Sequence, residues 1–482
     1  MPEPVAQRVY EPVIGLEIHV QLRTRTKMFC GCELSFGEEP NTRTCPVCLG
    51  HPGTLPVTNA EAVHFGLMIG MALGCEPAAR SIFHRKNYFY PDLPKGYQIS
   101  QYDIPLARNG RLADIRIHRV HLEEDAAKLV HAGASGRMHS AESSVVDFNR
   151  GGTPLVEIVT EPDVRSAAQA REWLELLQAT LRRLGVSDVR MEEGSLRCDA
   201  NVSIRPAGAA TLGTKTELKN MNSFRFLERG VNAELERQDE ILREGGEVTQ
   251  ETLHYDPATG ALTSMRSKEE AHDYRYLPEP DLVPLAPTEA MLERARAALP
   301  ELPAQRAERL ERELGLPREA AKQLAFKTEL ADFYEATVSA AGEDGDPRAI
   351  ANWVMGELVA QVGSDVDPAA SKLEPAALAA LVAMVGEGAV AGSAAKEVLA
   401  TLVAEGGEPE AVVEARGLSR AGGAELVEVV DRAMDAQAAA VEKIKAGNDK
   451  AMGAIIGAVM RETKGRADGA EVERLVRERI GG

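Results

Sequence analysis

Four prolines within residues 277–287 divide this sequence into two parts of different character. Proline fixes φ and lacks a backbone N–H, so a regular helix or a central strand cannot run through such a segment. Before it, short runs of alternating apolar and polar residues separated by turns predict a mixed sheet with few helices. After it, the chain is rich in alanine and shows helical periodicity. The sequence therefore predicts an α+β fold in which a mixed-sheet part precedes an all-α part.

The length of 482 residues exceeds what one hydrophobic core usually holds, so we expect more than one domain. We predict a mixed-sheet domain over residues 1–287 and a helical domain over residues 288–408. Glycine and proline between residues 406 and 409 mark a second boundary. Residues 409–482 would then form a small all-α tail domain with a modest core of its own.

Two helices of the first domain can be predicted from the sequence. Ser166 is a typical N-cap residue and Gly185 a typical C-terminal glycine, and large apolar residues recur between them at helical spacing. Residues 227–243 predict the second helix, which glycines end. Residues 255–265 predict a β-hairpin.

The balance of charged side chains limits how the protein can meet nucleic acid. Lys and Arg number 55 against 74 Asp and Glu, which gives a formal net charge of −19 and excludes a protein that coats nucleic acid by bulk positive charge. Small local excesses of basic residues at 205–229 and 436–482 suit either RNA contacts or an ordinary mixed surface. We see no signal peptide and no apolar run near the roughly 20 residues that span a bilayer, so we expect a cytoplasmic protein without membrane contact.

Four of the six cysteines lie at the two ends of one short segment. Cys30 and Cys32 form one close pair, and Cys45 and Cys48 form the other, with Gly and Pro beside them as in zinc knuckles. Four thiolates satisfy tetrahedral Zn²⁺ and leave no open position, so the expected site is structural. Four free thiols are the alternative.

Polar residues alternate with apolar ones in residues 16–22, as in a half-buried strand. Glu17, His19 and Gln21 therefore share one face of that strand. A carboxylate and an imidazole about 7 Å apart along a strand can converge on one ion or one phosphate. A solvated strand face gives the same pattern.

Glu157 interrupts the apolar run 153–159, which should lie inside a sheet. A buried carboxylate without a partner costs several kcal/mol, so Glu157 needs a cation or a hydrogen-bond donor. A metal ion is one solution. A structural pair with Arg150 and an edge strand with one wet face are the alternatives.

Three consecutive acids, Glu123, Glu124 and Asp125, follow a strand-like run whose alternation slips near residues 118–119. A β-bulge there would change the direction of Glu123 or Glu124. Carboxylates gathered from several segments make the hard-oxygen Mg²⁺ site that phosphoryl transfer uses, whereas acidic runs by themselves usually lie in water. The sequence leaves open which of the two glutamates would bind a cation.

Aromatic and basic residues are concentrated in residues 85–102. Such a mixture suits stacking and charge contacts with ATP or with the 3′ end of an RNA. A loop that packs its own tyrosines is the alternative. The candidate contacts are Lys86, Tyr88, Tyr90 and Lys95, to which Arg150 is added as a basic residue beside the run that contains Glu157.

Taken together, these segments resemble the GatB family, the tRNA-handling component of the aspartyl/glutamyl-tRNA(Asn/Gln) amidotransferases. The run at residues 146–163, VDFNRGGTPLVEIVTEPD, carries the clearest likeness. The other matching segments are residues 14–22, 85–101, 121–128, 191–205, 273–281 and 450–453. The resemblance extends over essentially the whole chain and is specific.

The resemblance implies a heterotrimer in which an amidase partner hydrolyses glutamine, a small third partner binds the other two, and ammonia travels through a channel into this chain. The chain would use ATP and Mg²⁺ to phosphorylate the side-chain carboxylate of Glu-tRNA(Gln) or Asp-tRNA(Asn), and ammonia would then displace phosphate. By the same resemblance, the first domain is a cradle, and the tail after residue 409 binds tRNA. The implied site and Mg²⁺ ligands are Glu17, His19, Glu124 and Glu157, with Glu124 as an alternative gate for ammonia and His19 as an alternative contact to phosphate.

Three rival functions remain. A zinc-stabilised tRNA-binding protein without catalysis accounts for the cysteines and the aromatic segment but leaves Glu157 unexplained. An archaeal relative of the GatB family that serves glutamyl-tRNA alone carries an extra domain, for which 482 residues leave no room. A free-standing ligase would need to use ammonia without partner proteins.

Overall fold

A computed structural model describes residues 10–34, 37–132, 143–219, 221–267, 274–363, 366–420, 423–446, 448–463 and 466–481. The chain divides into two compact units, residues 1–304 and residues 305–482. None of the helices in the described ranges has the length and apolar character needed to cross a bilayer.

The first unit is built on a nine-stranded mixed sheet in the order β13-β12-β11-β10-β1-β9-β6-β5-β2. Its neighbouring strands are antiparallel except β11 and β12, which are parallel. The strands are β1 (Tyr10–Gln21), β2 (Glu76–Pro77), β5 (Ala107–Leu112), β6 (Ile115–Glu124), β9 (Pro154–Thr160), β10 (Leu196–Pro206), β11 (Thr216–Lys219), β12 (Glu251–Tyr255) and β13 (Leu262–Ser267).

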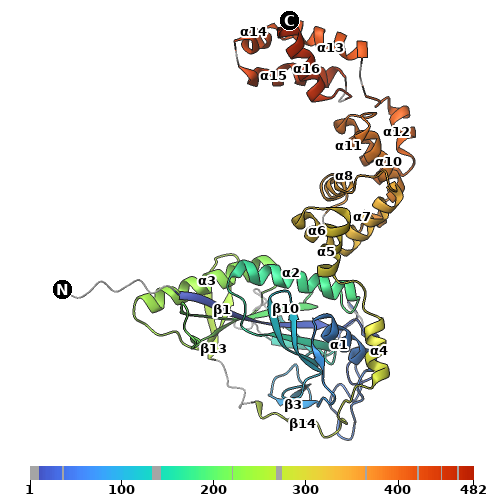
Figure 1. Ribbon diagram of the computed structural model, residues 1–482. Helices are drawn as coiled ribbons and strands as arrows, with labels where there is room; N and C mark the ends of the chain where they lie inside the picture. The colour runs from blue at the N-terminus through green and yellow to red at the C-terminus, as the bar shows by residue number, and fades with distance from the viewer. Residues whose placement is uncertain are drawn as a thin grey trace, which may run out of the picture. The chain divides into compact units, whose positions relative to one another are not determined.

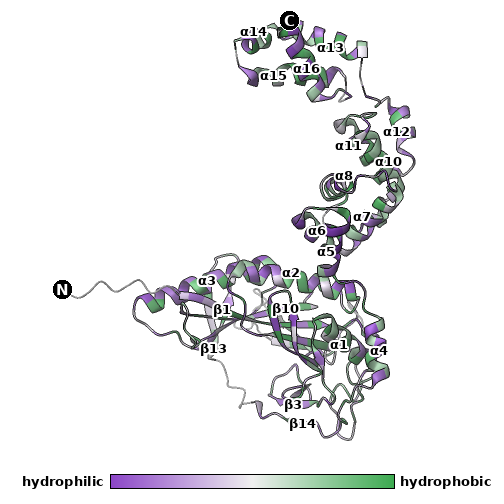
Figure 2. Ribbon diagram, in the orientation of Figure 1, coloured by the Kyte–Doolittle hydropathy of each residue, from purple (hydrophilic) through white to green (hydrophobic). Residues whose placement is uncertain are grey.

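Helices α1 (Ala60–Ala72), α2 (Ala167–Leu184) and α3 (Phe224–Arg243) pack on the apolar face of this sheet (Figure 1). A Cβ on Gly66 of α1 would lie 3.2 Å from Leu122 of β6, so the missing side chain allows close contact between helix and sheet. Along α2 and α3, hydrophobic residues alternate with hydrophilic ones, as expected for helices that bury one side (Figure 2). The opposite face of the sheet is therefore available for polar side chains.

Two small sheets complete the first unit. One has the order β14-β3-β4, with β3 (His84–Asn87), β4 (Tyr97–Ser100) and β14 (Leu277–Pro278). The other is the hairpin of β7 (Lys128–Ala132) and β8 (Ser143–Asp147). Helix α4 (Glu289–Ala297) follows the proline-rich segment. That segment is thus partly strand, because residues 277 and 278 pair with β3 as an edge strand, where a proline is tolerated.

The second unit is helical in its described ranges and contains two separate hydrophobic cores. One core gathers buried residues between 310 and 418, and the other gathers buried residues between 426 and 476. Its main elements are α5 (Pro303–Leu314), α6 (Arg318–Ala325), α7 (Thr328–Ala341), α8 (Pro347–Asn352), the π-helix Trp353–Leu358, α9 (Val359–Val362), α10 (Pro375–Gly386), α11 (Gly392–Glu405), α12 (Pro409–Arg416), α13 (Gly423–Ala436), α14 (Ala438–Lys445), α15 (Met452–Glu462) and α16 (Gly469–Gly481).

The local elements predicted from the sequence are found. Ser166 caps α2 by accepting a hydrogen bond from Gln169 N, and Gly185 ends the helix in the left-handed conformation with φ of 69°. The register of β6 against β9 shifts between Ile117 and Arg119, which is the predicted irregularity. A mixed sheet followed by helices is confirmed, while the boundaries at residues 287 and 408 stay predictions.

Candidate active site

Three strands bring histidines and glutamates together on the polar face of the large sheet. In β1 and β9, His19 lies directly opposite Glu157. In β6 and β9, His121 lies opposite the same glutamate. Residues that face each other across neighbouring strands project to the same side. The central strand β9 therefore presents Glu157 between two imidazoles.

Glu123 joins this group because it lies two residues after His121 and so shares its face. Nε2 of His19 is 3.6 Å from Oε1 of Glu123 and 3.6 Å from Oε2 of Glu157. Nε2 of His121 is 3.1 Å from Oε2 of Glu157, and Nη2 of Arg119 is 3.6 Å from Oε1 of Glu157. One ligand atom each from His19, Glu123 and Glu157 lies within 4.8 Å of the others, a spacing that a single metal ion can bridge.

The electrostatics of the cluster favour an ionised Glu157. Burial alone would raise the pKa of Glu157, but His121, His19 and Arg119 outweigh burial and hold it well below its usual value. Glu123 is also buried and accepts a hydrogen bond from Ser100 Oγ at 3.1 Å. A lasting negative charge on a buried carboxylate fits a divalent cation better than a neutral ligand.

The two glutamates left open by the sequence face different environments. Glu123 belongs to the cluster, whereas Glu124 forms an ion pair with Lys95 and accepts a hydrogen bond from Ile99 N at 3.0 Å. Consecutive strand residues project to opposite faces, which is why the two cannot share one cation. The expectation that Glu124 lies with Glu157 around one ion is therefore wrong.

Glu17 shares the polar face of β1 with His19 but lies outside the group of ligand atoms. One oxygen of its carboxylate accepts a hydrogen bond from Asn201 Nδ2 at 2.8 Å. The expected convergence of residues 17, 124 and 157 is thus replaced by His19, Glu123 and Glu157 in the described residues. Glu17 remains at the edge of that cluster, one strand repeat away.

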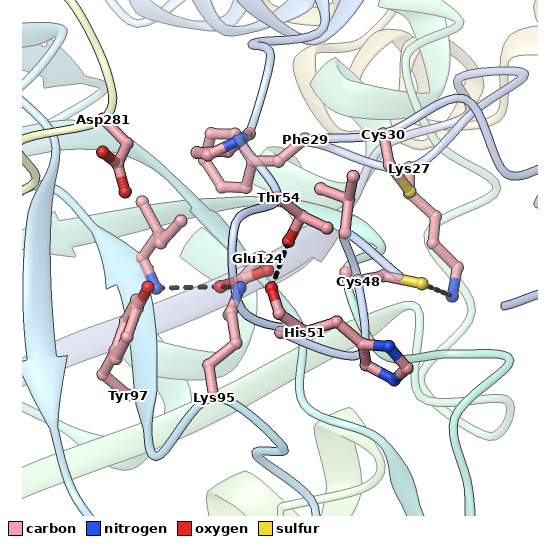
Figure 3. Close-up of a pocket in the computed structure, with 15 residues that line it drawn as sticks. Lys27, Phe29, Cys30, Cys48, His51, Thr54, Lys95, Tyr97, Glu124 and Asp281 are labelled. Atoms are coloured by element: carbon pink, nitrogen blue, oxygen red, sulfur yellow. Dashed lines mark hydrogen bonds and ion pairs between the residues drawn. The ribbon is translucent and has the colours of Figure 1, made fainter. Parts of the chain in front are cut away.

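Glu124 and Lys95 instead line a cavity of about 110 Å³ (Figure 3). Cys30 and Cys48 form part of its wall, as do Tyr97, Ile99 and Asp281. Figure 3 shows Glu124 beside Lys95, with His51 and Thr54 among the other residues that line the cavity. The cysteine segment is therefore part of the same cavity as the Glu124 ion pair.

The four cysteines of the predicted zinc knuckle come together. One sulfur of each lies within 4.8 Å of the others, and Zn–S bonds of about 2.3 Å would require sulfurs about 3.8 Å apart, so this donor set fits tetrahedral Zn²⁺. A hydrogen bond from Cys30 lowers the pKa of Cys48 to about 4. Buried Lys27 lies 3.8 Å from Cys48 Sγ and donates to Phe148 O at 3.0 Å. The cluster is thus joined to the segment that leads into β9.

Arg150 does not pair with Glu157. Its guanidinium donates to the carbonyls of Ala126 and Ala127 at 3.0 and 2.9 Å, and its Nε lies 3.8 Å from Asp125. The alternative in which Arg150 neutralises Glu157 is therefore wrong. Arg150 fixes the turn that follows Glu124 rather than the carboxylate cluster.

The aromatic segment contributes one basic residue near the cluster. Lys86 of β3 lies over the ring of Tyr274 and within electrostatic range of Glu123 and Glu157. Tyr88 is partly buried against Tyr274, with ring centroids 6.0 Å apart. Tyr90 is 41% exposed, so it is a surface residue.

Two residues that contact the cluster were not predicted from the sequence. His121 and Arg119 contact Glu157, yet neither was singled out. The signal for His121 is its spacing of two from Glu123, which places both on one strand face. The register shift at residues 117–119 hides the corresponding signal for Arg119.

Comparisons with known proteins point to one family. Residues 12–293 match a family model described as the GatB/GatE catalytic domain, and residues 332–480 match one described as the GatB domain. A Persephonella marina protein, named as the B component of aspartyl/glutamyl-tRNA(Asn/Gln) amidotransferase, is 47% identical over 479 residues, which cover 97% of this chain and 99% of the relative. Proteins of the same name from Geobacter sulfurreducens and Moorella thermoacetica are each 48% identical over 486 and 481 residues, covering 98% of this chain and 100% of each relative. These matches confirm the resemblance seen in the sequence.

Proposed function

This chain belongs to the GatB family of aspartyl/glutamyl-tRNA(Asn/Gln) amidotransferases, and on this premise we propose that it amidates Glu-tRNA(Gln), Asp-tRNA(Asn) or both at the cluster of His19, Glu123 and Glu157. The observation that carries the proposal is that the half-buried imidazole of His19 and the two buried carboxylates of Glu123 and Glu157 meet on the polar face of the sheet. A tRNA-binding protein without catalysis would have no use for two carboxylates gathered at one buried site, because burying charged groups costs several kcal/mol even when they are paired.

The reaction has two steps. An oxygen of the side-chain carboxylate on the tRNA-bound amino acid attacks the γ-phosphorus of ATP, and the bond to the bridging oxygen of ADP breaks. The nitrogen of ammonia then attacks the acyl carbon, the carbon–oxygen bond to phosphate breaks, and the amide loses a proton. A site closed to bulk water protects the acyl phosphate from hydrolysis.

His19, Glu123 and Glu157 would hold Mg²⁺, which supplies neutralisation of phosphate charge when bound. His121 contacts the carboxylate of Glu157 and so fixes its orientation. Arg119, on the same face, adds positive charge beside Glu157. Glu17, which is half-buried on the same face of β1 as His19, would be a candidate contact for the substrate.

The remaining parts of the protein would serve delivery and binding. A glutamine-hydrolysing amidase and a small third protein would complete a heterotrimer, and ammonia from the amidase would arrive by way of the cavity that Glu124 and Lys95 line. The four-cysteine cluster would hold structural Zn²⁺ in the wall of that cavity. Residues 409–482 would contact tRNA, and Tyr88, Tyr90 and Arg150 stay candidate contacts.

The proposal is tested with this chain co-purified with its amidase and small partners. Phosphate release is measured with ATP, Mg²⁺, ammonium chloride and Glu-tRNA or Asp-tRNA. Release that depends on the misacylated tRNA is expected for the wild type, and Glu157→Gln should lower it by about 100-fold or more because a ligand charge is lost. Glu161→Gln is the matched control, since this glutamate follows the same strand directly and pairs with the exposed His118, away from the cluster. Full activity of Glu157→Gln would refute the proposed site.

A further inference from the structure

Residues 274–281, named the strap here, lie against strand β3 although they come 187 to 194 residues later in the chain. Within the strap, β14 pairs antiparallel with β3. Arg85 donates to both oxygens of Glu279 at 2.8 and 2.7 Å, and the side chain of Glu279 is 0% exposed. Asn87 Nδ2 donates to Arg275 O at 2.8 Å. These two side chains of β3 fasten the strap on either side of the residue between them.

That residue is Lys86, and two tyrosines of the strap lie beside it. Lys86 Nζ is 4.8 Å from the ring centroid of Tyr274. Tyr274 meets Tyr276 nearly edge to face at 6.2 Å, and Tyr276 stacks on Tyr102 at 4.3 Å with an angle of 9° between the rings. Tyr88 packs against Tyr274 from β3's own segment at 6.0 Å. The rings hold one another, and thereby hold the ammonium over Tyr274.

Lys86 lies near the carboxylate cluster, because β3 pairs with β4 and Ser100 of β4 donates a hydrogen bond to Glu123. Burial alone would lower the pKa of Lys86, but Tyr276, Glu123 and Glu157 outweigh burial and keep it above the usual value for lysine. In the described part of the chain, no carboxylate lies within 4.0 Å of Lys86 Nζ to form a direct ion pair. A lysine that stays charged near cation ligands, without a close acid of its own, is suited to an anion that also contacts the cation.

We propose that the strap is a positioning element. Its residues Tyr274 and Tyr276 hold the ammonium group of Lys86 against the phosphoryl group that is transferred from ATP. This inference rests on the phosphoryl transfer proposed above. As the bond to ADP breaks, the negative charge on the oxygens of the transferred phosphoryl group is redistributed. The contact of these oxygens with the Lys86 ammonium therefore strengthens in the transition state. Loss of the correct position therefore lowers kcat more than it raises KM for ATP.

The experiment uses the complex with the amidase and the small partner and measures kcat and KM for ATP from tRNA-dependent phosphate release with ammonium chloride. Tyr274→Phe keeps the ring face, and Tyr274→Leu removes it. Tyr274→Phe should stay within about twofold of wild type, whereas Tyr274→Leu should lower kcat about tenfold with KM for ATP little changed. Because Tyr274 acts through Lys86, Lys86→Met/Tyr274→Leu should be no slower than Lys86→Met alone.

The outcomes separate the possible failures. Three results would each refute the strap as a positioning element. The first is a Tyr274→Phe variant as slow as Tyr274→Leu, and the second is a double variant in which the losses of the two single variants multiply. The third is an effect on KM for ATP alone. If Tyr274→Leu does not fold, Asn87→Asp replaces it, since it removes the donor to Arg275 O and leaves the ring intact; it should give the same loss of kcat and the same non-additivity. Unimpaired Glu157→Gln would mean that the proposed function itself fails, whereas full activity of Tyr274→Leu beside an inactive Glu157→Gln refutes the strap alone.

Discussion

Neighbouring glutamates on opposite faces of β6 should respond to the same substitution in different ways. Glu123→Gln removes one charge from the cluster, where Glu123 lies 3.6 Å from His19. Glu124→Gln instead removes the partner of Lys95, whose side chain is 10% exposed, and leaves Glu123 in place. The two variants change the same atoms on adjacent residues, so they compare the two faces directly.

The magnitudes follow from these surroundings. Loss of one charged ligand should raise the Mg²⁺ concentration for half-maximal activity by about 10- to 100-fold in Glu123→Gln. Breaking a buried ion pair costs about 3–5 kcal/mol when one charge is left alone. In Glu124→Gln the new amide oxygen can still accept from Ile99 N, so this substitution should cost about 2 kcal/mol. For the first unit, residues 1–304, an unfolding entropy of about 2.1 cal/mol/K per residue makes that a fall in Tm of roughly 3 °C.

The assay is a Mg²⁺ titration of tRNA-dependent phosphate release by the complex, together with thermal unfolding followed by circular dichroism. Glu123→Gln should shift the titration and keep Tm nearly unchanged, because Ser100 can still donate to the amide oxygen. Glu124→Gln should shift Tm and keep the Mg²⁺ requirement. An equal increase in Mg²⁺ requirement for both variants would show that the assignment of the two faces is wrong.

Changes in acid stability, zinc content and packing test other parts of the first unit. Burial alone would raise the pKa of Asp125, but Arg197 and Arg150 hold this pKa below its usual value. The ionised Asp125 therefore stabilises the fold fully above the unfolded pKa of about 4, and this stabilisation is lost as the pH falls through the lower folded pKa. Asp125→Asn should therefore flatten the acid side of the stability profile in urea unfolding between pH 3 and 7, and an unchanged slope would contradict this. Cys45→Ser should remove bound zinc in elemental analysis and speed hydrogen exchange in residues 27–50, while equal zinc content would argue against the four-thiolate site. Gly110→Ala would place a methyl group against Cys75 and 2.5 Å from Leu73 O, so it should destabilise the first unit by about 2–3 kcal/mol in urea unfolding, and a neutral effect would refute the close packing.

Local patterns in the sequence were sufficient for part of the site. Alternation in residues 16–22 placed His19 on a polar strand face, and the apolar run around Glu157 indicated a buried carboxylate that needs a partner. Both residues lie in the cluster because each pattern depends only on neighbours along one strand. The four cysteines likewise came together as their spacing predicted.

Other parts of the site depend on contacts that no local pattern contains. The choice between Glu123 and Glu124 depends on the strand register after the shift at residues 117–119. The alternation of apolar and polar residues before such a shift does not predict which face the residues after it occupy. The contact of Lys86 with Tyr274 joins residues 188 positions apart, and Tyr274 lies just before the proline-rich segment 277–287 that divides the sequence into two parts. Prolines correctly indicated irregular backbone, but they do not exclude pairing at a sheet edge.

Strand β1 has a consequence for how this protein is made. It pairs along one edge with β10, so that Tyr10 lies opposite Pro206, and along the other with β9. A ribosome that adds about 5–20 residues per second needs roughly 10–40 s to synthesise the chain between those partners. Until β9 has been synthesised, which takes roughly the first 7–28 s of that interval, neither edge of β1 has its partner, and such a segment is prone to aggregate. Synthesis in the absence of chaperones should therefore yield less soluble protein than the stability of the finished sheet would suggest.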